Sequence, residues 1–134
     1  MTYNAILSEG RSGTIVEKSV RQVQREVDEY IAQFREGYFP PMTLVVRMVE
    51  EVGELAREVN HTYGEKPKKA EEPDGDVALE LGDILFVTVC LANSLGIDLQ
   101  DAHDAVLEKF RTRDRDRFTR IEDFAAAPGR EKQE

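Results

Sequence analysis

Cysteine, long apolar runs and net positive charge are the features that this sequence has least of. Cys90 is the only cysteine among 134 residues, so no intrachain disulfide can form and nothing indicates an oxidising compartment. No apolar stretch reaches the roughly 18 residues that a membrane span needs. Residues 1–9 lack the basic and then apolar pattern of a signal peptide. We therefore expect a cytoplasmic protein with no membrane partner.

The net charge of −9 argues against a general nucleic-acid-binding protein, because such proteins carry a basic footprint. Hydrophobic residues make up 40% and charged residues 34% of the chain, a balance typical of folded, soluble proteins. A chain of this length forms one domain with a real core, near the size at which partners add stability. We expect a single domain over residues 14–120, an N-terminal arm at 1–13 and a flexible tail at 121–134.

The first half of the sequence predicts two helices. Thr14 followed by Glu17 matches a capping box, and the apolar side chains behind it recur at three- and four-residue steps. Gly37 and the two prolines that follow it are expected to end this helix. Pro41 suits the first position of the next helix, because proline has no backbone N–H to leave unsatisfied there.

Two further helices are predicted in the second half. Residues 62–75 hold several glycines and prolines and are expected to form a loop. The third helix, over about 76–95, is apolar on nearly every side, which predicts burial all round and, in so small a chain, a subunit interface. It ends at Gly96, and Asp98 is the expected N-cap of the fourth helix. Because no segment has the period of a strand, the predicted fold is all-α with four helices.

Acidic residues interrupt two of the apolar helical runs. Residues three apart share one face of a helix, so Glu51 lies beside Glu54, and Glu80 beside Asp83. Burying carboxylates close together is costly without positive charge, which either a basic side chain or a metal ion supplies. Two such pairs on successive helices favour the metal, and an all-oxygen site suits Mg²⁺ or Mn²⁺.

The order of these acids is also a motif. Glu-Glu-x-x-Glu at 50–54, followed after a loop by Glu-x-x-Asp at 80–83, resembles the MazG-like nucleotide pyrophosphohydrolases. The resemblance runs from about Tyr38 to Phe118, includes Lys-Phe-x-x-Arg at 109–113, and is greatest to the short, single-domain bacterial members. It implies a four-helix, bundle-like fold that assembles as a homodimer or homotetramer. The implied reaction is hydrolysis of a nucleoside triphosphate to the monophosphate and pyrophosphate with Mg²⁺.

The resemblance also implies residue roles. Glu50 would lie beside the metal ligands, where it either binds a second ion or orients the attacking water. Lys109 and Arg113 match the basic positions that the family directs at the phosphates, and Arg117 lies one turn further on. The implied metal ligands are Glu51, Glu54, Glu80 and Asp83.

Cys90 departs from the family pattern, because many members carry Asn at this position. It shares a helix face with Asp83 and is therefore expected to line the pocket. Its apolar neighbours argue against a nucleophilic role. Base recognition stays open, since each of four aromatic side chains either stacks on a base or packs in the core: Phe34, Tyr38, Phe39 and Phe86.

Three other interpretations fit parts of the sequence. Activity on dUTP, dCTP or phosphoribosyl-ATP uses the same acids, and a catalytically silent helical interaction module would keep the fold alone. Glu58 and His61 have the Glu-x-x-His spacing of a di-iron bundle, which needs that motif twice. The only other histidine, His103, lacks it. We therefore expect His61 to be a surface residue at the end of its helix.

Overall fold

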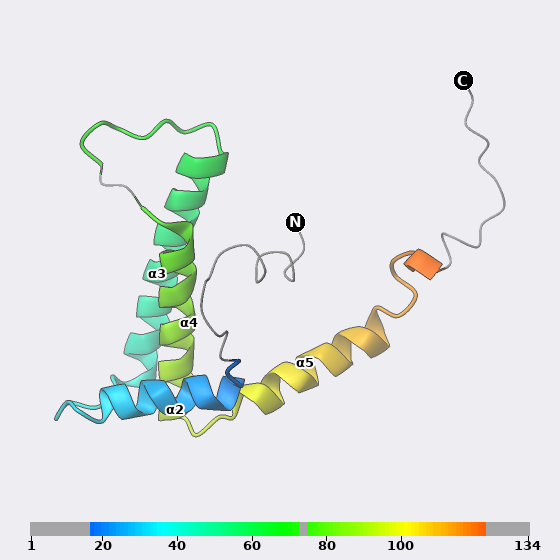
Figure 1. The fold of residues 1–134 in the computed structure, drawn as a ribbon, viewed down its shortest axis with the longest axis horizontal. Coiled ribbons are helices and arrows are strands. Elements are labelled where there is room, and N and C mark those ends of the chain that lie inside the picture. The colour runs from blue at the N-terminus through cyan, green and yellow to red at the C-terminus, as the bar shows by residue number, and fades with distance from the viewer. Residues whose placement is uncertain (1–16, 73–74, 123–134) are drawn as a thin grey trace. The chain divides into compact units, whose positions relative to one another are not determined.

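The computed structural model describes residues 17–72 and 75–122, and four α-helices lie within them (Figure 1). No strand occurs in that part of the chain, so the all-α prediction is confirmed. The chain divides into two compact units, residues 1–100 and 101–134. The single domain over 14–120, its bundle arrangement and the homo-oligomer therefore stay predictions. The helices are α2 (Val20–Ile31), α3 (Pro41–Tyr63), α4 (Val77–Ser94) and α5 (Leu99–Arg113).

A capping box starts α2, but not the one predicted. The Ser19 hydroxyl accepts the Gln22 backbone N–H at 3.2 Å, and the Gln22 side chain accepts the Ser19 N–H at 2.6 Å. Glu17 precedes the helix, so the predicted box at Thr14 and Glu17 is wrong for α2; Thr14 itself, like most of the predicted arm and tail, lies outside the described residues. Ser-x-x-Gln offers the same chemistry five residues later, immediately before the first residue of α2.

The end of α2 and the start of α3 depend on local chemistry. The helix ends at Ile31, before the predicted stop, and the chain then turns as far as Gly37. Gly37 has φ +63°, a left-handed conformation that glycine adopts without strain. Pro41 occupies the first turn of α3, as predicted.

The hairpin of α3 and α4 is the main helix pair of the first unit, and α2 packs across α4 (Figure 1). Asp76 caps α4, its side chain accepting the Ala78 N–H at 2.8 Å. Gly96, at φ +67°, follows the helix, so the predicted bounds of about 76–95 are confirmed. The Asp98 side chain accepts the Gln100 N–H at 2.9 Å, as expected of the cap of α5.

A small core ties α2 to the hairpin. It is centred on Val27, Leu44, Val89 and Cys90. Beside it, the Tyr38 hydroxyl donates a hydrogen bond to Asp28 at 2.7 Å and accepts one from Asn93 at 3.0 Å. Burial and the bond to Asp28 raise the pKa of Tyr38 to about 12, so the phenol stays protonated. These bonds hold the segment between α2 and α3 against α4.

The predicted burial of α4 on all sides is wrong for the single chain. Leu79, Leu81 and Leu85 are 67%, 53% and 53% exposed. Within the described residues α2 and α3 pack against other faces of α4 and leave these leucines uncovered. With 18 residues and a mean hydropathy of 1.6, α4 also meets the length and composition criterion for a membrane span, which corrects the expectation that no stretch does. This is weak support for a span, since core helices of soluble proteins meet the same criterion.

Candidate metal centre and adjoining cavity

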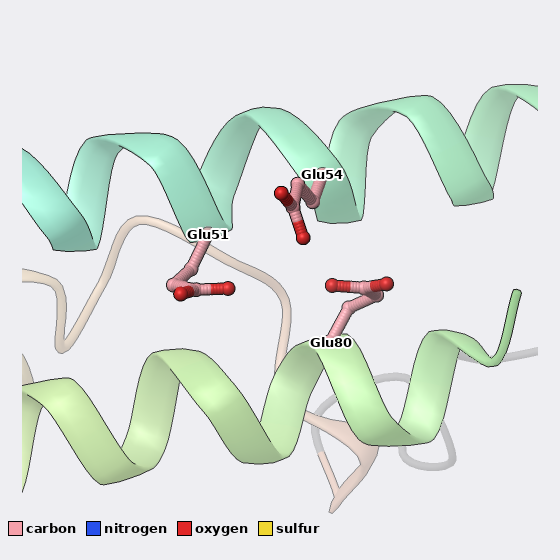
Figure 2. Close-up of side chains that lie close together, drawn as sticks. All are labelled: Glu51, Glu54 and Glu80. Atoms are coloured by element: carbon pink, nitrogen blue, oxygen red, sulfur yellow. The ribbon is translucent and has the colours of Figure 1, made fainter.

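Three carboxylates from the two hairpin helices come together. Glu51 and Glu54 project from α3 and Glu80 projects from α4 into the space between the helices (Figure 2). Each offers one oxygen atom, and these three atoms lie within 4.8 Å of one another. The structure thus brings together three of the four residues predicted as metal ligands.

Desolvation and mutual repulsion act on these acids. Burial raises the pKa of Glu51, and the charges of Asp83 and Glu54 raise it further. Burial likewise raises the pKa of Glu80, followed by the charges of Glu54 and Asp83. The Oε2 atom of Glu80 is buried and has no hydrogen-bond partner. A donor set made only of carboxylate oxygens, one of them buried and unpartnered, fits a hard divalent cation.

Asp83 and Glu50 lie around this group of three. Asp83 is exposed rather than buried, although apolar residues flank it in the sequence. Its charge is nevertheless the first electrostatic cause of the raised pKa of Glu51. Glu50 is exposed, and its charge is the last of the causes acting on Glu51. The roles predicted for Asp83 and Glu50 stay predictions.

A cavity of about 430 Å³ adjoins Glu51, one of the three acids. Glu51 and Asp83 both line it, so the acids form part of its wall. The rest of the wall is mostly apolar, and the volume lies in the range of small-molecule sites. The cavity is lined by all four of the aromatic residues singled out from the sequence: Phe34, Tyr38, Phe39 and Phe86.

Cys90 also lines the cavity, as expected from its place on the same face of α4 as Asp83. Its side chain is buried, and burial raises the pKa of the thiol. The thiol therefore stays protonated at neutral pH, in agreement with an inert rather than a nucleophilic cysteine.

Sequence reasoning missed Arg47. Its guanidinium lies over the Phe39 ring, 5.7 Å from the ring centroid, and Arg47 is the only basic residue among the described residues that line the cavity. Its charge lowers the pKa of Glu51, against the effect of burial. The signal was its position four residues before Glu51, which places both side chains on one face of α3.

The predicted phosphate-binding residues lie on α5, in the second unit. Arg113 forms a two-bond ion pair with Asp114, with donor–acceptor distances of 3.1 and 3.0 Å. Lys109 and Arg113 both lie over the Phe110 ring, 5.3 and 5.1 Å from its centroid. Arg117 lies 3.6 Å from Asp114. The phosphate-binding role of these residues stays a prediction.

His61 is placed differently from the prediction. It lies in the last turn of α3, but its side chain is only 4% exposed. The loop after α3 returns over this turn and brings Glu72 to 3.6 Å from the ring. The expectation of a surface histidine is wrong because helix periodicity does not report where a loop packs.

By fold and site this is an all-helical domain with paired acids at the wall of a small-molecule cavity. It matches the model of the MazG nucleotide pyrophosphohydrolase domain over residues 39–118. It is 61% identical over 107 residues to the uncharacterized protein YpjD of Bacillus subtilis (strain 168), covering 80% of this chain and 96% of that protein. The chain belongs to the MazG nucleotide pyrophosphohydrolase family, as the motif predicted.

Two solved structures are similar to this one. The crystal structure of YPJD from B. subtilis, described as a candidate pyrophosphatase, is 59% identical with a TM-score of 0.65, covering 72% of this chain and 98% of that one. The crystal structure of a Bacillus-conserved MazG protein, described as a nucleotide pyrophosphohydrolase, is 52% identical with a TM-score of 0.65, covering 76% and 99%. The protein is therefore a hydrolase that acts on pyrophosphate bonds, in a family that is generally metal-dependent.

Proposed function

We propose that this protein hydrolyses nucleoside triphosphates to the monophosphate and pyrophosphate with Mg²⁺, which Mn²⁺ can replace, and that it cleans the cytoplasmic nucleotide pool. One observation carries the proposal: Glu51 belongs both to the group of three carboxylates and to the wall of the cavity. A nucleoside held in the cavity would thus have its phosphates beside the acids.

The cation is assigned to Glu51, Glu54, Glu80 and Asp83. When bound, it polarises a phosphoryl oxygen and neutralises charge on the leaving pyrophosphate. Four carboxylates exceed the charge of one divalent ion, so further cations are expected to enter with the nucleotide. Carboxylates also suit the remaining task, which is to accept a proton from the attacking water.

The other residues of the site bind and orient the substrate. Glu50, on the solvent side of the acids, either holds a second ion or orients the water. The aromatic walls of the cavity stack on the base, since every base has an apolar face. Arg47 is placed to meet a polar atom of the nucleoside or its first phosphate. Lys109 and Arg113 are assigned to the outer phosphates, where cations stabilise the charge of the transition state.

The partners proposed are the nucleotide and further copies of the chain, with no nucleic acid and no membrane. The exposed leucines of α4 are an apolar surface on a helix that also carries Glu80. Covering them with a second subunit removes apolar area from water and supports a homodimer or homotetramer.

Two alternatives remain. A related pyrophosphohydrolase of dUTP, dCTP or phosphoribosyl-ATP would use the same acids, and only the cavity would distinguish it. A catalytically silent interaction module would keep the fold and bind no metal. The survival of all five motif acids favours an enzyme over the module.

The test is pyrophosphate release from a panel of canonical and modified nucleoside triphosphates, dUTP, dCTP and phosphoribosyl-ATP included, with Mg²⁺, Mn²⁺ or EDTA. Glu54→Gln is the matched control, because it keeps the size of the side chain and removes its charge. We expect metal-dependent release that this variant loses. Release that is unchanged in EDTA would contradict the metal assignment, and silence without metal binding would favour the interaction module.

A further inference from the structure

The protein buries a histidine whose ring has no hydrogen-bond partner. The His61 side chain is 4% exposed, and neither Nδ1 nor Nε2 forms a hydrogen bond. Buried polar atoms left unpartnered cost free energy, so such an atom in a native site calls for an explanation. Nothing in the proposed hydrolysis uses this ring.

A carboxylate faces each of the two ring nitrogens. Nδ1 lies 4.0 Å from Oε1 of Glu58, and Nε2 lies 3.6 Å from Oε2 of Glu72. Both separations exceed hydrogen-bond length. The two carboxylates differ in environment, because the Glu58 side chain is 7% exposed and the Glu72 side chain 35% exposed. The carboxylate on the Nε2 side is therefore the more exposed of the two.

Glu58 is fixed in place from several directions. It lies in the last two turns of α3, with Arg57 at 3.8 Å. Gly75 presses against the Glu58 carboxylate so closely that a side chain at position 75 would collide with it. A carboxylate held in this way suits the task of orienting the imidazole through Nδ1.

We propose that Nε2 of His61 and the Glu72 carboxylate hold a second cation, a transition metal such as Zn²⁺, with Glu58 as the residue that orients the imidazole. Two ligand atoms each about 2.1 Å from one tetrahedral ion lie about 3.4 Å apart, close to the 3.6 Å observed here. Metal-bound histidines commonly donate their other ring N–H to a carboxylate, which is the place of Glu58. The metal also supplies the partner that the buried ring lacks.

This site differs from the three-carboxylate centre in chemistry as well as in residues. An imidazole ligand suits Zn²⁺, Cu²⁺, Ni²⁺ and Fe²⁺, whereas an all-carboxylate set suits Mg²⁺ and Mn²⁺. Two protein ligands leave the remaining positions to water, so the metal is expected to exchange readily. Binding would join Glu72, in the loop after α3, to the last turn of α3. The inference does not depend on the proposed nucleotide chemistry.

The test uses the full chain and Co²⁺ as a coloured probe for Zn²⁺, titrated in excess Mg²⁺ and followed by visible absorption. We expect one class of Co²⁺ site that Zn²⁺ displaces. His61→Ala and Glu72→Gln should abolish it, and Glu58→Gln should weaken it about 10–100-fold. His103→Ala is the matched control, because His103 is the only other histidine and its side chain is 60% exposed.

Glu54→Gln separates the two centres. We expect Glu54→Gln to keep the Co²⁺ site and His61→Ala to lose it. If Glu54→Gln lost the site and His61→Ala kept it, the proposal would be overturned. An absence of Co²⁺ binding to the wild type would also overturn it. If His61→Ala fails to fold by circular dichroism, the His61 ring resonances of the wild type replace it. They should shift on adding Zn²⁺ while those of His103 do not, and unshifted His61 signals would count against the site.

Discussion

The carboxylates of Glu51 on α3 and Glu80 on α4 approach each other across the hairpin, each offering an oxygen within 4.8 Å of the other and of Glu54. Burial and neighbouring negative charge raise the pKa of both groups. Two helices that pack through such a contact keep like charges together, which destabilises the hairpin unless a cation joins them. Function and stability are therefore coupled at this point of the fold.

We expect Mg²⁺ or Mn²⁺ to raise the melting temperature, because a cation that binds only the folded state stabilises it by mass action. When the cation concentration is 100 times its dissociation constant, the free energy of unfolding rises by about 2.7 kcal/mol. Each kcal/mol corresponds to about 2–8 °C for domains of this size range. Differential scanning fluorimetry with millimolar metal, reversed by EDTA, measures the shift. The melting temperature of Glu54→Gln should rise less than that of the wild type. A wild-type melting temperature that does not change with metal would contradict the proposed metal centre.

The metal-free protein is expected to lose stability as pH rises. Glu51 and Glu80 have folded-state pKa values above their ordinary 4.5, so between 4.5 and the raised values the folded state binds more protons than the unfolded state. The free energy of unfolding then falls with increasing pH across that window. Urea unfolding in EDTA at a series of pH values measures it. In Glu80→Gln the free energy of unfolding should fall less steeply with pH than in the wild type. An equal slope in the variant would mean that other groups cause the fall.

Asp83→Asn should abolish turnover while leaving the helices intact. Asp83 is exposed and lies outside the closest group of three oxygens, so losing its charge removes repulsion with Glu51 and creates no cavity. We expect unchanged circular dichroism and an unchanged or slightly higher melting temperature without metal. Pyrophosphate release with Mg²⁺ measures activity, and a fully active variant would exclude Asp83 as a ligand.

The sequence predicted what local patterns control. Proline at the first turn of α3 and aspartate before α5 set those helix starts through backbone chemistry that involves only a few residues. The closeness of Glu51 and Glu54 followed from helix spacing, and their meeting with Glu80 was predicted from two acidic pairs on successive helices. These features need no knowledge of how distant segments pack.

The features that sequence missed depend on distant packing. His61 is buried because the loop after α3 returns over it, and no residue near His61 encodes that return. Asp83 is exposed although apolar residues flank it in the sequence, since the immediate neighbours of a helical residue lie on other faces of the helix. An apolar run in sequence therefore predicted burial that a single chain does not supply.

Leu85→Glu is expected to weaken self-association. The Leu85 side chain is 53% exposed on α4, so a charge there costs the isolated subunit little but is desolvated if a second subunit covers it. Size-exclusion chromatography with light scattering should show a homo-oligomer for wild type and a smaller species for the variant. The matched control is Val49→Glu on α3, which is 67% exposed. A monomeric wild type would contradict the oligomer.

Arg47→Ala should raise KM more than it lowers kcat. Arg47 is held over Phe39 at the cavity wall and does not belong to the three-carboxylate centre. We therefore expect it to bind the substrate and not to assist the reaction. A hydrogen bond from a charged group contributes about 1.5–3 kcal/mol, equivalent to roughly 10–100-fold in kcat/KM. Arg25→Ala, on an exposed part of α2 outside the cavity wall, is the matched control and should leave both constants unchanged. Arg47→Lys keeps the charge and loses the planar stack on Phe39, so it should recover only part of the affinity. A fall in kcat alone would instead place Arg47 against the reacting phosphate, because only groups that act in the transition state lower kcat without changing KM.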